Sequence, residues 1–216
     1  HLQWKGQPFM SDAHMDALGF LVESASTANP HGFPVGFTQT TDAQGQAWTG
    51  LGCAACHTGE VSYQGKRMRR DGGQGLIDFS TFESDLIESL KAVQSNTDSF
   101  AGFADALGTV PGDRPALQKQ LGALIESLTS RHAMNAVDVA YGHGHLDALG
   151  QIFNAVAVDF LGLAQNRRAP DAPVSFPVLW DAPHLDVVQW NGSAPNAGPG
   201  PLLQNITTAL AVYGSL

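Results

Sequence analysis

The feature that most constrains the fold of this chain is the stretch at residues 52–59, GCAACHTG, which holds both of its cysteines. A disulfide between residues three apart would close too small a loop to add much stability, and a structural zinc site needs four ligands from two such pairs. Cys-x-x-Cys-His is the attachment pattern of a c-type haem, in which each thiol adds to a vinyl group and the adjacent imidazole ligates the iron. The motif therefore predicts one haem c, bound covalently through Cys53 and Cys56, with His57 as the metal ligand.

A redox-active cysteine pair of the thioredoxin type is the alternative interpretation of this motif. Such a pair lies at a strand-to-helix junction in a βαβ pattern, and no strand pattern of that kind precedes Cys53. Covalent haem attachment implies maturation outside the cytoplasm, so we expect a periplasmic or secreted protein. The chain begins at His1 without a basic and then apolar leader, which we interpret as a processed form or a fragment.

Charge and hydropathy argue against two classes of partner. The 216 residues include 20 acidic and 11 basic ones, for a net charge of −9, which argues against a nucleic-acid-binding surface. No apolar run approaches the roughly 18 residues of a membrane-spanning helix, and the longest, at 152–163, is interrupted by Asn154, Asp159 and Gly162. We therefore expect neither nucleic-acid binding nor a membrane span.

The pattern of apolar residues predicts a mostly α-helical haem domain with one small β-hairpin and long irregular loops. Residues 61–70, centred on Gln64 and Gly65, predict the hairpin, while the segments at 28–46 and 167–201 read as loops. The nearly apolar segment at 146–163 is expected in the middle of the core, beside the haem. Helices are predicted at 11–26, 79–93, 99–107, 115–134, 146–163 and 202–213, with a short one at 47–56 that presents the haem. We expect a single domain over 1–216, with an N-terminal helix and loop at 1–46 and the haem-binding core at 47–216.

Four blocks of the sequence resemble, in the same order, blocks of the dihaem cytochrome c peroxidase superfamily, and in particular its branch of secreted rubber oxygenases. They are CAACHTGEVSYQGKRMRRDGGQGLIDF, YGHGHLDALGQIFNAV, APVSFPVLWDAPHLDVVQWNG and LLQNITTALAVYG. The resemblance covers residue 50 to the end. Two features depart from the family. The second Cys-x-x-Cys-His of a C-terminal domain is absent, which places the second haem on a missing segment or on another chain. His145 stands where relatives often carry arginine.

The resemblance implies a cytochrome c-like fold and a haem that reacts with peroxide or dioxygen, with His57 as the proximal ligand. The residues implied near the open face of the haem are Phe160, Phe176 and Trp180, together with Phe153. Trp180 or Trp190 would relay an electron toward a second haem. The partners implied besides peroxide or dioxygen are an electron donor or a second haem domain. His145 becomes a possible iron ligand in place of the family's arginine.

Several roles stay open at this point. The sixth iron ligand is water or an open position, or comes from His132, His143, His145, His184, Met68 or Met134. Arg67 and Arg69, with their basic neighbours, either neutralise haem propionates or form a solvated hairpin edge. Asp147 and Asp181 are either general acids for O–O cleavage or, as is commoner, turn and helix caps.

The favoured function is therefore a haem c oxidoreductase of the peroxidase or rubber-oxygenase kind. Its rival is an electron-transfer c-type cytochrome whose haem is six-coordinate and leaves no place for an oxidant. A haem-based sensor is a third possibility, which would require an output module.

Overall fold

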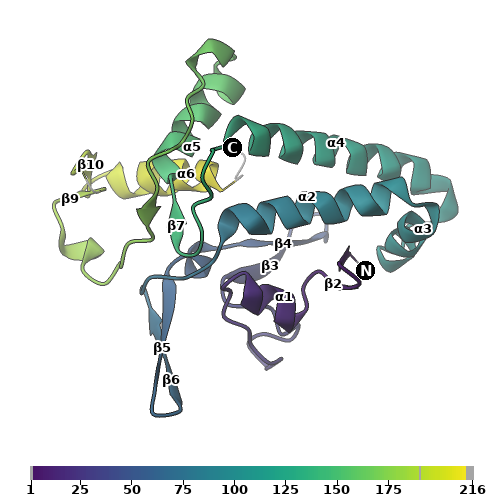
Figure 1. Ribbon diagram of the computed structural model, residues 1–216, viewed down its shortest axis with the longest axis horizontal. Coiled ribbons are helices and arrows are strands. Elements are labelled where there is room, and N and C mark those ends of the chain that lie inside the picture. The colour runs from purple at the N-terminus through teal and green to yellow at the C-terminus, as the bar shows by residue number, and fades with distance from the viewer. Residues whose placement is uncertain (1, 190, 213–216) are drawn as a thin grey trace. The chain divides into compact units, whose positions relative to one another are not determined.

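The computed structural model describes residues 2–189 and 191–212 (Figure 1). Packing divides these residues into two compact units. Unit 1 comprises residues 2–34 and 78–134, and unit 2 comprises residues 35–77 and 135–212. The expected division of one domain at residue 46 stays a prediction.

Unit 1 confirms three of the predicted helices. Asp78 caps α2, since its carboxylate accepts a hydrogen bond from the Thr81 N–H at 3.0 Å, and Asn96 caps α3 in the same way through Ser99. Leu90 and Val93 of α2 form a buried cluster with Leu121 and Ile125 of α4. The elements of unit 1 are β1 (Gln3–Trp4), β2 (Gln7–Pro8), α1 (Asp12–Ala17), α2 (Phe79–Ser95), α3 (Thr97–Ala106) and α4 (Arg114–Met134).

The first helix of unit 1 is much shorter than the predicted 11–26. Ser11 caps it as expected, but it ends at Ala17. Gly19 takes the left-handed conformation, with φ at +81°, and the Phe20 N–H bonds back to the Met15 carbonyl at 3.0 Å. This closure by a left-handed glycine is a common way for a helix to end, and it overrides the apolar spacing further along the chain.

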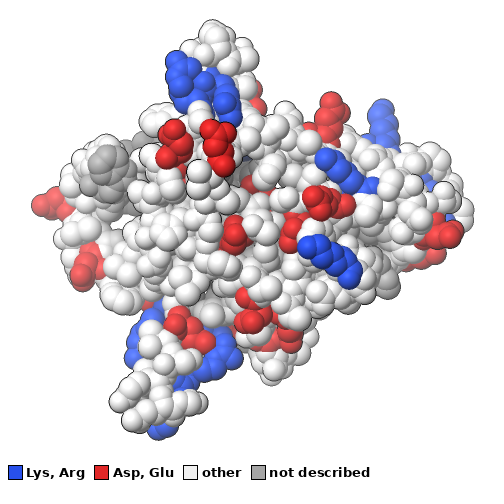
Figure 2. All heavy atoms as spheres, viewed as in Figure 1, with Lys and Arg blue, Asp and Glu red and all other residues white. Residues whose placement is uncertain are grey.

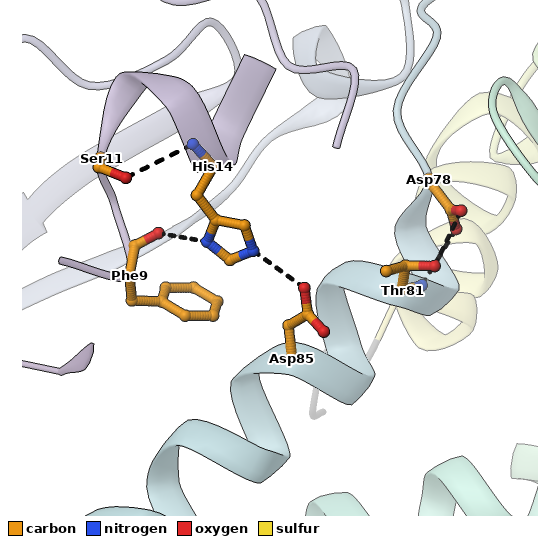
Figure 3. A network of polar contacts seen from close by, with 6 residues as sticks. All are labelled: Phe9, Ser11, His14, Asp78, Thr81 and Asp85. Atoms are coloured by element: carbon orange, nitrogen blue, oxygen red, sulfur yellow. Dashed lines mark hydrogen bonds and ion pairs between the residues drawn. The ribbon is translucent and has the colours of Figure 1, made fainter. Parts of the chain in front are cut away.

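His14 of α1 lies at the centre of a buried polar network (Figure 3). Its Nδ1 is 2.7 Å from the Phe9 carbonyl oxygen, and its Nε2 is 2.9 Å from Asp85 Oδ2 on α2. Trp4 stacks on the imidazole, with ring centroids 5.6 Å apart, and Phe9 meets it edge-on. Both ring nitrogens therefore have protein partners.

The described part of unit 2 is built from short antiparallel strand pairs, 3-10 and π-helical turns, and two α-helices. Its strands are β3 (Phe37–Thr41), β4 (Ala47–Leu51), β5 (Thr58–Tyr63), β6 (Lys66–Asp71), β7 (His145–Leu146), β8 (Val174–Ser175), β9 (Val187–Val188) and β10 (Ala194–Pro195). They pair as β3 with β4, β5 with β6, β7 with β8 and β9 with β10. Its helices are α5 (Ala148–Asn154) and α6 (Gly200–Ala211).

The hairpin predicted at 61–70 is confirmed as β5 and β6. Its register joins Val61 to Met68 and Tyr63 to Lys66. The two turn residues, Gln64 and Gly65, have φ values of +50° and +73°. Positive φ at both central positions defines the type I′ turn, whose twist matches that of paired strands.

The expectation of a mostly α-helical, cytochrome c-like fold is wrong. Among the described residues, six α-helices are accompanied by five two-stranded sheets, so the chain is a mixture of α and β structure. The short helix predicted at 47–56 is strand β4 followed by a single 3-10 turn at Cys53–Ala55, and β3 occupies part of the predicted loop. These strands are rich in threonine with a tryptophan, residues that favour extended backbone, but they lack the apolar alternation that marks a half-buried strand.

The helix predicted at 146–163 is also corrected. It consists of strand β7, helix α5 and a π-helical turn at Ala155–Phe160. Phe153 is 69% exposed and Phe160 51% exposed, whereas Asn154 and Ala155 are buried, so the segment is not buried on all sides. Its apolar composition does not by itself determine burial. No helix of the described residues is long and apolar enough to cross a bilayer.

Candidate cofactor site

The cysteine motif forms a tight turn between β4 and β5. The Cys53 carbonyl oxygen accepts hydrogen bonds from the N–H groups of Cys56, at 3.2 Å, and His57, at 3.0 Å. Both thiols are free, with Cys53 exposed and Cys56 partly buried. Within the described residues, no group of three or more His, Cys, Asp or Glu side chains is arranged to hold a metal ion. The turn thus presents two thiols and an imidazole within five residues.

Two glycines hold this turn through backbone contacts alone. The Gly36 carbonyl accepts from the Gly52 N–H at 2.7 Å, and the Gly75 N–H donates to the Cys56 carbonyl at 2.8 Å. A Cβ on Gly36, whose φ is +93°, would lie 2.3 Å from the Ala55 nitrogen. A Cβ on Gly75 would lie 2.7 Å from the Cys56 oxygen. Neither position has room for a side chain, which explains why glycines flank the motif.

His57 has one ring nitrogen engaged and the other available. Its Nδ1 lies 2.8 Å from the carbonyl oxygen of Pro177. Because a carbonyl only accepts, Nδ1 carries the proton, which leaves the Nε2 lone pair for another partner. No protein partner for Nε2 exists within the described part of the chain. Metal-ligating histidines characteristically donate their second N–H to a carbonyl or carboxylate in this way.

Phe176 and Trp180 lie on the segment that contacts His57. The Phe176 ring centroid is 6.5 Å from that of His57. The Trp180 indole N–H donates to the Asp71 carbonyl at 2.9 Å, and its ring packs against Gly72, whose N–H donates to the His57 carbonyl. The structure therefore brings two of the three predicted aromatic residues to the motif, with Phe176 buried and Trp180 exposed.

The other predicted aromatic residues are not joined to the motif. Phe160 and Phe153 lie at α5 and its π-helical turn, and no ring contact links them to His57 among the described residues. Trp190 lies outside the described residues. The roles of Phe160, Phe176 and Trp180 at an open haem face stay predictions.

The predicted alternative ligands differ in how far their ring nitrogens are satisfied. His145 of β7 has Nδ1 2.8 Å from the His143 carbonyl and Nε2 3.2 Å from Ser175 Oγ, so both nitrogens are engaged. His143 is exposed and has only Nδ1 engaged, 2.9 Å from the Leu76 carbonyl. His132 lies in unit 1, where its hydrogen bond to the Glu83 carboxylate raises the pKa of the imidazole. Of these histidines, His143 most resembles His57.

The arginines of the hairpin are exposed. Arg67 Nε is 2.6 Å from Glu60 Oε1, and Arg69 lies opposite Glu60 in the strand register. The exposure of Arg67 and Arg69 does not test their predicted contact with haem propionates, which stays a prediction. Asp147, by contrast, has a structural role. Its buried carboxylate accepts hydrogen bonds from the Gly150 N–H at 2.9 Å and the Ala172 N–H at 3.1 Å.

The backbone around the two thiols argues against a thioredoxin-type pair. Burial, and then the charge of Cys53, raises the pKa of the Cys56 thiol to about 12. Redox-active pairs of the thioredoxin type lie at the start of a helix that follows a strand. Here a 3-10 turn connects two strands.

Sequence reasoning missed Pro177, Gly36 and Gly75 as residues of the site. The Pro177 carbonyl reaches His57 across 120 positions of the chain, a separation that no local pattern reveals. Gly36 and Gly75 flank the motif in the sequence, which is a visible pattern. A glycine pattern alone, however, does not distinguish a flexible loop from a close backbone contact.

Comparisons with known proteins give one informative match. The chain is similar to the uncharacterized protein y4iJ of Sinorhizobium fredii (strain NBRC 101917 / NGR234), with 34% identity over 231 aligned residues that cover 96% of this chain and 37% of that protein. The chain thus spans little more than a third of the length of this relative. No family model matches the sequence. No solved structure matches it either.

Proposed function

We propose that the chain is a haem c oxidoreductase that reacts with peroxide or dioxygen, with haem bound through Cys53 and Cys56 and ligated by His57. The observation that carries the proposal is the state of His57. It completes a Cys-x-x-Cys-His motif, and its Nδ1 proton is held by the Pro177 carbonyl while Nε2 is available. We place the chain, on the same grounds and on the sequence resemblance, in the dihaem cytochrome c peroxidase superfamily.

The surroundings of the motif fit a porphyrin. The segments that touch the motif expose apolar side chains, namely Leu76, Val178 and Trp180. Leu76 follows Gly75, which bonds to Cys56, and Val178 follows Pro177, which bonds to His57. A porphyrin is a large apolar disc, and burial of such side chains against it is favourable. Arg67 and Arg69 supply the cations that its propionates require.

The chain's own residues prepare the site. Haem, when bound, supplies the iron that reduces peroxide or activates dioxygen. The Pro177 carbonyl fixes the tautomer and orientation of His57 and makes Nε2 a more basic ligand. Phe176 lies beside the imidazole, with ring centroids 6.5 Å apart. Trp180, held by Asp71 and Gly72, keeps an exposed indole near the ligand, where an electron donor or second haem domain would approach.

One observation favours the rival function of electron transfer. His143 also donates its Nδ1 proton to a carbonyl and keeps Nε2 without a partner among the described residues. It is tied to the motif through residues 75–77, because Gly75 bonds to Cys56 and Gly144 to Ile77. Ligation of the iron by both His57 and His143 would give a six-coordinate haem with no place for an oxidant.

The test begins with the chain produced in a host that matures c-type cytochromes in the periplasm. We expect a covalent haem that survives denaturation and is lost in the Cys53→Ser/Cys56→Ser variant. The ferric protein should show a high-spin EPR signal that becomes low-spin with cyanide, and the protein should consume peroxide. Absence of covalent haem would refute the proposal. The electron-transfer function would be established instead by two results together. The wild-type signal would be low-spin and unchanged by cyanide, and it would become high-spin in His143→Ala but not in the control His184→Ala.

A further inference from the structure

The β5–β6 hairpin has two chemically different faces. In a strand, alternate residues point to opposite faces, and the register therefore sorts the side chains into two sets. One set, which we call the apolar–basic face, contains Val61, Tyr63, Lys66, Met68 and Arg70. The other, which we call the mixed-charge face, contains Glu60, Ser62, Arg67, Arg69 and Asp71.

The mixed-charge face carries carboxylates as well as cations. Arg67 forms an ion pair with Glu60, and Asp71 lies on the same face. The apolar–basic face has no carboxylate. Its Lys66 and Arg70 are exposed, and between them lie Val61, Tyr63 and Met68 with exposed fractions of 56%, 64% and 37%. Apolar side chains this exposed, on a sheet of only two strands, lack the stabilisation that burial would give. They indicate a surface that a binding partner covers.

The hairpin has a fixed base and a free end. Thr58 is buried, and the indole of Trp180 donates to the Asp71 carbonyl. From this base the two strands extend beyond the other elements of unit 2 (Figure 1). The space-filling view shows lysine and arginine gathered over this extension (Figure 2). Residues 58–71 include four of the chain's 11 basic residues and two of its 20 acidic residues. The rest of the chain therefore carries a net charge of −11.

We propose that the apolar–basic face is a contact site for an anionic phospholipid surface. Its cations complement anionic headgroups, and tyrosine is favoured at the boundary between headgroups and acyl chains. The small area of the apolar–basic face favours a lipid surface over a protein partner. Three apolar side chains on strands of six residues offer far less than the roughly 1,000 Å² of a stable protein interface. A lipid surface requires no complementary shape, and the acidic remainder of the chain restricts contact to this hairpin.

The test measures sedimentation of the full chain with large unilamellar vesicles. We expect binding to vesicles of about equal phosphatidylglycerol and phosphatidylcholine, weakened by salt, and none to phosphatidylcholine alone. The Lys66→Gln/Arg70→Gln variant should bind about 30-fold more weakly, the loss expected for two cationic contacts. The matched control, Arg67→Gln/Arg69→Gln, removes the same charge from the other face and should lose less than about threefold. Tyr63→Ser should weaken binding while leaving the charge unchanged.

Two results would overturn the inference. One is an equal loss in both double variants, which would mean that charge alone attracts the chain to vesicles. The other is no binding to anionic vesicles at low salt together with binding to poly-glutamate, which would assign the face to an acidic protein. The readout requires no haem, so its failure would leave the proposed oxidoreductase function standing.

Discussion

His14 in unit 1 and His57 in unit 2 show how the same side chain serves two purposes. His14 is 5% exposed, with both ring nitrogens bonded and the rings of Trp4 and Phe9 packed against it. His57 is partly exposed, and only its Nδ1 is bonded. A fully satisfied imidazole holds a fold together, because any change leaves a buried partner unpaired. A half-satisfied one is oriented but still able to bind a ligand.

The largest expected effect comes from removing each imidazole in turn from the chain without haem. His14→Ala leaves the buried Asp85 carboxylate without its partner and should lower the free energy of unfolding by about 3 kcal/mol or more. His57→Ala removes one hydrogen bond at a partly exposed position and should cost about 1 kcal/mol or less. Urea unfolding followed by circular dichroism measures both. Equal losses would contradict the distinction between a structural and an available histidine.

A smaller loss of stability is expected at the cysteine turn, which is held by backbone contacts of glycine. Gly75→Ala places a Cβ 2.7 Å from the Cys56 carbonyl oxygen and should lower stability by about 2 kcal/mol. Gly50→Ala, on strand β4 with nothing within 4 Å of its Cβ position, is the matched control and should change stability by less than about 0.5 kcal/mol. The same urea experiment applies. If the two variants behaved alike, the glycine contacts would not be holding the motif.

The smallest effect concerns a third histidine, His132, whose side chain is 40% exposed. Its hydrogen bond to Glu83 raises its pKa, so the folded state favours the charged ring. The stabilisation is therefore fully present below the ordinary pKa of about 6.5 and is lost as the pH rises through the raised value. Solvent screening limits it to a few tenths of a kcal/mol. Glu83→Gln should remove this pH dependence, whereas Glu88→Gln, on the same helix but exposed, should keep it.

The parts of the fold that were predictable are those fixed by local chemistry. Helices α2 and α3 carry their own caps at Asp78 and Asn96, and the β5–β6 hairpin carries a glycine in its turn. Strands β3 and β4 were missed because their polar residues show no burial pattern. The exposed Phe153 was placed in a core because apolar composition does not distinguish a buried helix from an uncovered one.

The candidate site was predictable only in part for the same reason. Its two thiols and the imidazole of His57 lie within five residues and form a recognisable motif. The group that orients His57 comes from Pro177, far along the chain, and is a backbone carbonyl whose position depends on the fold and not on a side chain. Phe176 was assigned to the site from a resemblance between blocks of sequence, and its placement next to His57 could not have been derived from spacing.

The close contact between Gly36 and the motif also decides where a reporter group can be attached. Ala55 is buried, and its backbone and Cβ lie at the position that a Gly36 side chain would need, so Ala55 cannot be enlarged. Ala54, its neighbour between the same two cysteines, is exposed. An unnatural amino acid at position 54 would carry a fluorophore or spin label on the turn that holds both cysteines. The proposed attachment of haem could then be tested in real time without altering either thiol or the imidazole.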